Sequence, residues 1–230
     1  MIVLGLDTAT KACSAAVWKQ GAVLAHECVP MERGHTEALI PMVERVLGAA
    51  ARAFRDLDLI AVTVGPGAFT GLRVGLAAAR GIALAADIPC IGVTTLEAIA
   101  AAVPRQEQDE RIVLVVLETK RGDFYAQAFS PEGIGLAAPR VVDATALPDL
   151  VQVREAVVAG DAAAAVIAEL RAAGVVAELA TVAEFADAGV VADIAARRFL
   201  AKEGPLQPPS PLYVRRPEAQ LAVSGGRRRP

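Results

Sequence analysis

The pattern of apolar and polar residues predicts alternating strands and helices along most of the chain. Apolar, β-branched runs predict strands, whereas apolar stripes with a period of 3.6 residues predict helices. Strands are expected within Met1–Thr10, Ser14–Trp18, Ala22–His26, Ile60–Val64, Pro89–Val93, Arg111–Thr119, Phe124–Phe129, Val157–Gly160 and Val175–Leu179. Helices are expected at Arg33–Ala51, Thr70–Ala86, Leu96–Val103, Ala162–Ala173 and Val190–Lys202, with Thr36, Thr70 and either Thr94 or Thr95 as N-caps. This order is typical of an α/β protein.

The strand pattern occurs twice. An apolar strand ending in an acidic residue and a threonine, followed by a hairpin, begins at Ile2 and again about 110 residues further on, at Arg111. The repeat predicts two α/β lobes of duplicated origin. The polar stretch Pro104–Glu110 is the best boundary between them, so we expect lobes at 1–104 and 105–214, followed by a basic tail at 215–230.

The helix expected at Thr70–Ala86 is apolar on nearly every side. Only Arg73 and Arg80 are charged within it. Such a helix must be covered on two sides, and we expect a second subunit on one of them; the alternative is that the rest of this chain covers both. Small residues near one face, which would let another backbone approach closely, are Gly71, Gly75, Ala78 and Ala85.

Gly65-Pro66-Gly67 forms the turn before this helix. A glycine turn that leads into a helix N-terminus can bind an anion, but this stretch lacks both the P-loop ending and the G-x-G-x-x-G pattern. A tight turn without a ligand remains an equal alternative. Asp7 and Thr8, at the end of the first strand and before a hairpin, have the layout of the first phosphate loop of actin-like ATPases, or simply end a strand.

Composition and charge argue against a nucleic-acid-binding surface on the folded part of the chain. The 230 residues are 54% hydrophobic and 4% aromatic, with a net charge of −3. The tail 215–230 holds five arginines and one glutamate, which leaves 18 basic and 25 acidic residues in 1–214. An acidic body with few aromatic rings is a poor nucleic-acid surface by itself. The tail is expected to be disordered, and whether it touches RNA is left open.

The chain begins with a strand and contains no signal-like segment, so a cytoplasmic location is expected. A membrane span is not expected, because the longest apolar segment is short and contains two arginines. The three cysteines form no C-x-x-C pair and are expected to be buried free thiols. His26 and His35 form no metal-binding pair, so we expect no metal and give both histidines a structural or partner-contacting role.

Five motifs, LGLDTAT, GHTEALIP, GPGAFTGLRVG, IGVTTLEA and PLYVRRPE, together resemble the bacterial TsaB (YeaZ) family of tRNA threonylcarbamoyladenosine synthesis. The resemblance covers most of residues 1–125 and returns at Pro211–Arg215. It implies an actin-like ATPase (ASKHA) fold of two ribonuclease-H-like lobes, with mixed sheets and flanking helices. It also implies a non-catalytic scaffold subunit that dimerises with TsaD, the subunit that transfers the threonylcarbamoyl group, and supports turnover assisted by the ATPase TsaE.

In that family the two N-lobe helices, here Thr36–Ala50 and Thr70–Ala86, form the dimer interface with TsaD or with a second copy. The resemblance therefore implies a partner interface of Thr36, Leu39, Ile40, Val43, Phe69, Thr70, Gly71, Leu72, Arg73, Gly75, Leu76 and Ala79. Whether the homodimer or the heterodimer is the resting form is left open. No intrinsic cofactor is implied, and tRNA would be met only through the complex.

Nucleotide binding is a separate question. ATP or ADP at the subunit junction is left open, with Asp7, Thr8, Gly65 and Gly67 as candidate contacts. The chain has Glu118-Thr119-Lys120-Arg121 where family members usually have Asp-Ala-Arg, and only one glycine at Gly160-Asp161, where an actin-like ATPase has a glycine-rich loop. The alternative function is an actin-like small-molecule kinase or ATPase that uses Asp7 and Thr8 around Mg-ATP. A metallopeptidase is disfavoured, because the chain lacks the second histidine of a two-histidine metal site.

Overall fold

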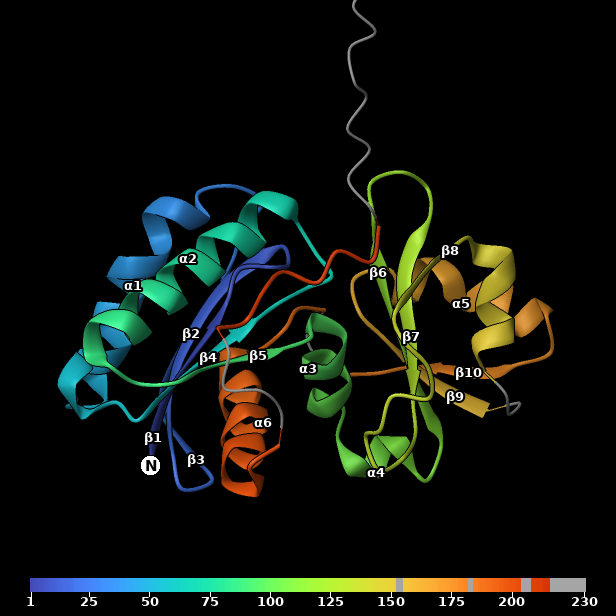
Figure 1. Ribbon diagram of the computed structural model, residues 1–230. Coiled ribbons are helices and arrows are strands. Elements are labelled where there is room, and N and C mark those ends of the chain that lie inside the picture. The colour runs from blue at the N-terminus through green and yellow to red at the C-terminus, as the bar shows by residue number, and fades with distance from the viewer. Residues whose placement is uncertain (152–154, 182–183, 204–207, 216–230) are drawn as a thin grey trace, which may run out of the picture.

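Two five-stranded mixed sheets with the same topology organise the molecule (Figure 1). The computed structural model describes residues 1–151, 155–181, 184–203 and 208–215. The first sheet has the order β3-β2-β1-β4-β5, with β1 (Ile2–Asp7), β2 (Ala12–Lys19), β3 (Ala22–Pro30), β4 (Leu59–Thr63) and β5 (Cys90–Val93). The second has the order β10-β9-β6-β7-β8, with β6 (Ile112–Glu118), β7 (Phe124–Phe129), β8 (Arg140–Val142), β9 (Glu155–Ala159) and β10 (Val176–Leu179).

The strand directions confirm the internal repeat. In the first sheet β1 pairs antiparallel with β2 and parallel with β4, and in the second β6 pairs antiparallel with β7 and parallel with β9. Each lobe is thus a hairpin meander extended by two parallel strands. The strand expected at Val175–Leu179 is β10, which lies at an edge of the second sheet.

Helices cover both faces of the first sheet and lie between the two sheets. They are α1 (His35–Ala49), α2 (Phe69–Ala86), α3 (Thr95–Ala102), α4 (Arg105–Gln108), α5 (Ala163–Ala172) and α6 (Ala188–Ala201), with short 3₁₀ turns η1 (Phe54–Asp56) and η2 (Ala144–Leu150). In Figure 1, α1 and α2 lie outside the first sheet, α3 and α6 lie between the sheets, and α5 lies outside the second.

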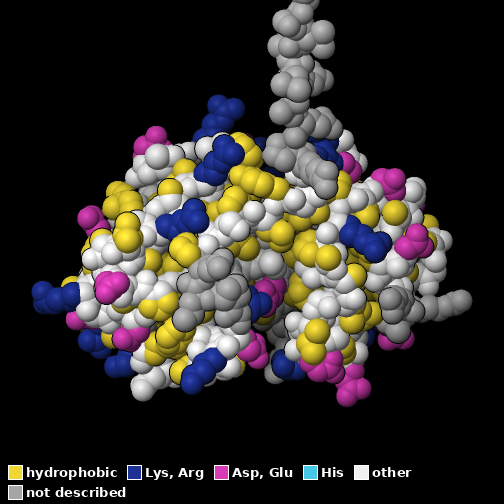
Figure 2. Space-filling view, viewed as in Figure 1, with side chains coloured by type: hydrophobic (Ala, Val, Ile, Leu, Met, Phe, Trp, Pro, Cys, Tyr) yellow, Lys and Arg dark blue, Asp and Glu magenta, His cyan; other side chains and the backbone are white. Residues whose placement is uncertain are grey.

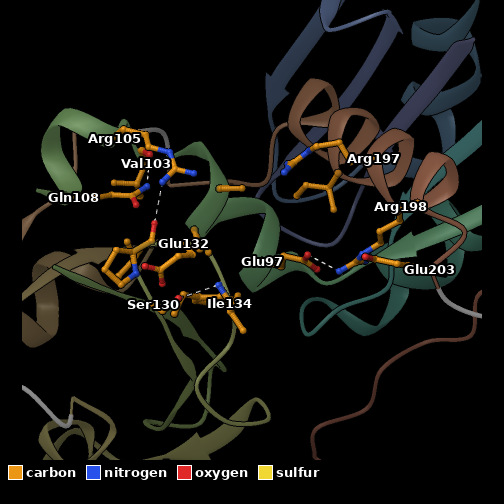
Figure 3. A pocket seen from close by; sticks show the side chains of 18 residues that line it. Glu97, Val103, Arg105, Gln108, Ser130, Glu132, Ile134, Arg197, Arg198 and Glu203 are labelled. Atoms are coloured by element: carbon orange, nitrogen blue, oxygen red, sulfur yellow. Dashed lines mark hydrogen bonds and ion pairs between the residues drawn. The ribbon is translucent and has the colours of Figure 1, made fainter. Parts of the chain in front are cut away.

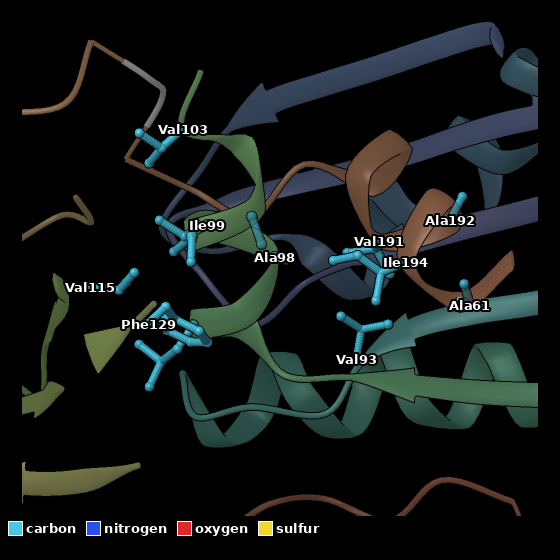
Figure 4. Packing of buried hydrophobic residues seen from close by; sticks show 14 of the residues in the cluster. Ala61, Val93, Ala98, Ile99, Val103, Val115, Phe129, Val191, Ala192 and Ile194 are labelled. Atoms are coloured by element: carbon cyan, nitrogen blue, oxygen red, sulfur yellow. The ribbon is translucent and has the colours of Figure 1, made fainter. Parts of the chain in front are cut away.

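The central strands are buried on both faces, which explains their continuous apolar sequence. On β1, Val3 belongs to the central core and Leu4 to the core under α1 and α2. Figure 4 shows the central core, in which Ile99 of α3 and Ile194 of α6 are buried in the same cluster as Phe129 of β7. This cluster joins the two lobes.

The last helix returns to the first lobe. The expected division at residues 104 and 105 separates the strands of the two sheets, but it assigns α6 to the second lobe, whereas α6 packs on β1, β2 and β4. A Cβ placed on Gly5 would lie 2.0 Å from the carbonyl oxygen of Ala188, so only glycine at this position lets α6 lie on β1. Periodicity predicts which face of a helix is buried, but not which sheet buries it.

Two expected helix caps are wrong. α1 begins at His35 after Gly34, whose φ is 98°, and α2 begins at Phe69 after Ala68; neither helix has a side-chain cap. Thr94 does cap α3 by accepting a hydrogen bond from the amide of Glu97. Each observed N-cap lies two residues before the expected threonine, and both N-termini line the cleft between the lobes.

Candidate functional site

A cleft of about 550 Å³ lies between the lobes, at the position where the first phosphate loop was expected. Its first-lobe wall consists of the loop after β1 and the N-termini of α1 and α2. The end of β6 and the hairpin after it form the second-lobe wall. Residues that line it include Thr10, Lys11, Gly67, Glu118, Lys120 and Asp161.

Asp7, the expected nucleotide contact, is fully buried and does not line this cleft. Its carboxylate accepts hydrogen bonds from the Thr63 hydroxyl (2.6 Å), the Ala9 amide (3.1 Å) and the Thr10 hydroxyl (2.9 Å). Burial raises the pKa of Asp7, and these hydrogen bonds oppose the rise. The side chain therefore holds the loop after β1 in place, with its oxygens directed at the protein.

Thr8 and Gly65 are also buried, and only Gly67 of the four candidate nucleotide contacts lines the cleft. The Thr8 hydroxyl donates to the carbonyl of Gly71 at 2.7 Å, which ties the loop to the first turn of α2. Gly65 has a φ of 107° and lies against Leu72. Asp7, Thr8 and Gly65 thus support the segments that form the cleft wall, and of these four residues Gly67 alone lines the cleft.

Lys11 joins the two walls of the cleft, although no sequence motif predicted this role. Its ammonium group donates to Glu118 at 2.9 Å and lies 3.3 Å from Asp161. The hydrogen bond to Glu118 is the main cause that raises the pKa of Lys11, and it lowers the pKa of Glu118 in turn. The only cue in the sequence was the glutamate that departs from the family's usual stretch, because its basic partner lies 107 residues earlier.

The second surface is a groove of about 500 Å³ between α1 and α2, on the outer side of the first lobe. Five residues of the expected interface are exposed and line it, namely Thr36, Ile40, Phe69, Thr70 and Arg73. The other seven are buried within the chain: Leu39, Val43, Gly71, Leu72, Gly75, Leu76 and Ala79. The sequence pattern did not separate the face of this helix pair that packs on the chain from the face that is exposed.

The close backbone approach expected at Gly71 and Gly75 occurs inside the chain. A Cβ on Gly71 would lie 1.9 Å from the carbonyl oxygen of Thr8, and one on Gly75 would lie 2.5 Å from the Thr8 hydroxyl oxygen. These glycines therefore seat α2 on the loop after β1. By length and composition alone, α2 could cross a membrane. Core helices of soluble proteins often meet the same criteria, and α2 packs on β4 and α1.

A serine, a histidine and an aspartate meet where α6 begins. His26 Nε2 lies 2.9 Å from an Asp187 carboxylate oxygen and 3.4 Å from the Ser14 hydroxyl oxygen. A catalytic triad needs the base to use two different ring nitrogens, and here one nitrogen faces both groups. Ser14 is also fully buried and accepts a hydrogen bond from the Ala188 amide. The cluster therefore anchors α6.

The thiols and histidines offer no metal centre within the described ranges, where no group of three or more His, Cys, Asp or Glu side chains could hold an ion. Cys13 and Cys90 are buried free thiols as expected, whereas Cys28 is exposed because β3 is an edge strand. His35 is buried at the start of α1, and its Nε2 has no hydrogen-bond partner among the described residues.

A further cavity of about 470 Å³ lies between α3, α6 and the end of β7 (Figure 3). In Figure 3, Glu97 and Arg198 point towards each other across it, and they form an ion pair. Arg105 donates to the carbonyl of Pro131 at 3.2 Å. Because these arginines bond to the chain itself, we assign no ligand to this cavity.

Comparison with known proteins agrees with this geometry. The family described as "TsaD: tRNA N6-adenosine threonylcarbamoyltransferase" matches residues 28–223. The tRNA threonylcarbamoyladenosine biosynthesis protein TsaB of Escherichia coli is 36% identical over 162 residues, which are 70% of this chain and 69% of that protein. The chain spans 53% and 58% of the next two curated relatives.

Solved structures are similar over nearly the whole chain. YeaZ from Pseudomonas aeruginosa has a TM-score of 0.76 and 25% identity, and the match covers 92% of this chain and 99% of that one. Component A of the (R)-2-hydroxyglutaryl-CoA dehydratase of Acidaminococcus fermentans has a TM-score of 0.54 at 13% identity, over 86% and 98%, and is similar in fold alone. The expected actin-like ATPase fold of two lobes is thereby confirmed. The chain belongs to the TsaB (YeaZ) family, within the wider family that the TsaD match defines.

Proposed function

We propose that this protein is a non-catalytic partner subunit in tRNA threonylcarbamoyladenosine biosynthesis, and that it docks a TsaD subunit on the groove between α1 and α2. Membership of the TsaB family supports a part in this biosynthesis. The TsaD match over residues 28–223 supports kinship between the two subunits.

The observation that carries the proposal is the exposed apolar character of the groove. Of the groove residues, Ile40 is 42% exposed and Phe69 is 46% exposed; Leu84, near the end of α2 and outside the groove lining, is 85% exposed. Large apolar side chains that gather on one face typically mark a protein interface. Figure 2 shows apolar side chains over α2 with basic side chains among them.

The state of the cleft supports a non-catalytic role. The carboxylate that an actin-like kinase would use for its metal ion, Asp7, is bonded to three groups of its own lobe. Lys11, one of the cations that line the cleft, is bonded to two acids of the other lobe. A nucleotide phosphate that paired with Lys11 would have to displace these two acids, so we place any ATP or ADP at the junction with the partner.

Membership of the family is also the basis for proposing its other partners, its location and its oligomeric state. The protein supports TsaE-dependent turnover, meets tRNA only through the complex, and acts in the cytoplasm. Alone it forms a homodimer through the same groove, so the two copies must separate before TsaD binds. The basic tail lies outside the described residues from position 216 onwards.

The test is a charge placed in the groove. Leu72→Arg does not serve this purpose, because Leu72 is only 3% exposed and the charge would disrupt the fold. Ile40→Arg instead alters an exposed wall of the groove, and Leu179→Arg on β10, where the native side chain is 46% exposed, is the matched control. We expect Ile40→Arg to weaken TsaD binding at least about tenfold, because an unpaired charge would be buried at the contact.

Affinity is measured by calorimetry with purified TsaD, and the modified nucleoside is measured in tRNA from cells depleted of this protein and rescued with each variant. Ile40→Arg should fail in both assays while Leu179→Arg passes. Equal TsaD affinity for the two variants would refute the docking site. Normal threonylcarbamoyladenosine after depletion would refute the pathway.

A further inference from the structure

The C-terminal part of the described chain, Pro208–Arg215, runs from the first lobe to the second, and we call it the strap (Figure 1). The Leu212 amide donates to the carbonyl of Val64 at 2.7 Å. A Cβ on Gly65 would lie 3.0 Å from the Leu212 carbonyl oxygen, and a Cβ on Gly92 would lie 2.9 Å from the Pro209 Cβ. The ends of β4 and β5 thus form a seat for the strap that larger side chains would crowd.

Tyr213 joins the strap to the exposed side of α2. Its ring centroid lies 5.7 Å from that of Phe69 at an interplanar angle of 31°. Arg73 donates through Nε to the Tyr213 hydroxyl at 3.3 Å, and its guanidinium carbon lies 3.5 Å from the centre of the Phe69 ring. Phe69 and Arg73 are two of the exposed residues that line the α1–α2 groove, so a strap residue holds part of the proposed docking surface.

Arg215, two residues further on, joins the strap to the second lobe. Its guanidinium forms an ion pair with Asp123, at the start of β7. Asp123 also accepts a hydrogen bond from the Thr119 hydroxyl, and this bond, followed by the ion pair, lowers the pKa of Asp123. Thr119 lines the cleft. One end of the strap therefore touches the groove, and the other end touches the hairpin between β6 and β7 that forms the opposite wall of the cleft.

The groove and the cleft also share a wall. Thr36, Phe69, Thr70 and Val74 line both of them. An occupant of the groove must therefore contact the residues that Tyr213 packs against. A change in the packing of Phe69 has a direct route, through Tyr213 and Arg215, to the second lobe.

We propose that the strap couples docking on the α1–α2 groove to the β6–β7 hairpin at the cleft. A partner that immobilises Phe69 and Arg73 holds Tyr213, and Arg215 then holds Asp123 and its hairpin. Because such coupling is reciprocal, a ligand that orders the hairpin strengthens docking on the groove. The inference rests on the proposed function, since TsaD is the occupant of the groove.

Hydrogen exchange of the full chain, with and without purified TsaD, tests the coupling. In the wild-type protein, TsaD should slow amide exchange both in α2 and in the hairpin at residues 118–124. Tyr213→Ala and Arg215→Gln each remove the side-chain contact at one end of the strap. Both variants keep Lys11, which also bonds to residues on the opposite wall of the cleft. In both variants α2 should remain protected by TsaD, while the protection of the hairpin is lost. Arg140→Gln, at an exposed arginine on β8, is the matched control and should behave as the wild type.

The possible outcomes separate the two proposals. If TsaD protects α2 but not the hairpin in the wild type, or protects the hairpin equally in the strap variants, the coupling is overturned and the docking site stands. If TsaD leaves α2 unprotected in the wild type, the proposed function itself fails. If Tyr213→Ala does not fold, Arg215→Gln decides alone, because both members of its ion pair are partly exposed and their loss leaves the core intact.

Discussion

The seat of α2 on the loop after β1 makes a strong prediction about two glycines of the same helix. Gly71→Ala places a Cβ 1.9 Å from the Thr8 carbonyl oxygen, and that oxygen belongs to the backbone, so helix and loop must separate by more than about 1 Å to restore normal contact. Gly81→Ala is the matched control, because nothing lies within 4 Å of its added Cβ.

The expected changes in the free energy of unfolding follow from these contacts. Forcing an extra methyl group into a packed site costs about 1–3 kcal/mol. The hydrogen bond between the Thr8 hydroxyl and the Gly71 carbonyl would also be lost or strained, which costs about 1 kcal/mol. The better helix propensity of alanine offsets about 1 kcal/mol. We therefore expect Gly71→Ala to lower the free energy of unfolding by about 2 kcal/mol, and Gly81→Ala to raise it by up to about 1 kcal/mol.

Equilibrium urea unfolding, followed through the fluorescence of Trp18, measures both changes. Trp18 is the single tryptophan, and it is buried on β2 in the same lobe as α2. The difference between the two variants should be about 3 kcal/mol, far above the error of the method. If Gly71→Ala were as stable as Gly81→Ala, the helix would not lie on the loop as described, and the structural role assigned to Asp7 and Thr8 would lose its basis.

Three other predictions concern titration, thiols and nucleotide. The ion pair with Asp187 raises the pKa of His26, so its contribution to stability is full below the unfolded pKa, about 6.5, and is lost as pH rises through the folded value; urea titrations at pH 6 and pH 9 should show His26→Gln destabilising only at the lower pH. A thiol reagent should modify Cys28 in the native protein and reach the other two cysteines, whose pKa values burial raises to about 12, only after unfolding. Calorimetry with Mg-ATP should give the same heat for wild type and Asp7→Asn, because Asp7 does not line the cleft; tight binding that this variant abolishes would favour the kinase alternative.

Much of the fold could be predicted because its signals are local. The β6–β7 hairpin, the capped start of α3 and the edge strand β10 depend on runs, turns and caps of a few residues each. The helix starts at α1 and α2 could not be predicted in this way. Their threonines matched the cap pattern, but the two N-termini lie at a cleft where neighbouring segments, and not their own side chains, set the backbone.

The candidate site was predictable in part, for the same reason. The motif around Gly67 marked the correct loop and helix, and the periodicity of α2 marked a helix without a polar face. Which side of that helix the chain itself covers depends on Thr8, 63 residues away from Gly71, and no pattern within the helix carries that information. The choice of Leu72 as an exposed contact failed there, while Phe69 and Arg73 remained on the surface.

The sequence alone determined the order and type of most elements, the internal repeat and the family, because periodicity, turn residues and motifs are properties of neighbouring positions; the short elements α4, β8, η1 and η2 were not predicted. Only the tertiary structure decided that α6 returns to the first sheet, that Asp7 faces inward, that Lys11 reaches Glu118 across the cleft, and that the strap joins α2 to the second lobe. These are contacts between residues at least 56 positions apart in the sequence. Such contacts are set by how whole layers pack, and the residues on either side of each one carry no local sign of it.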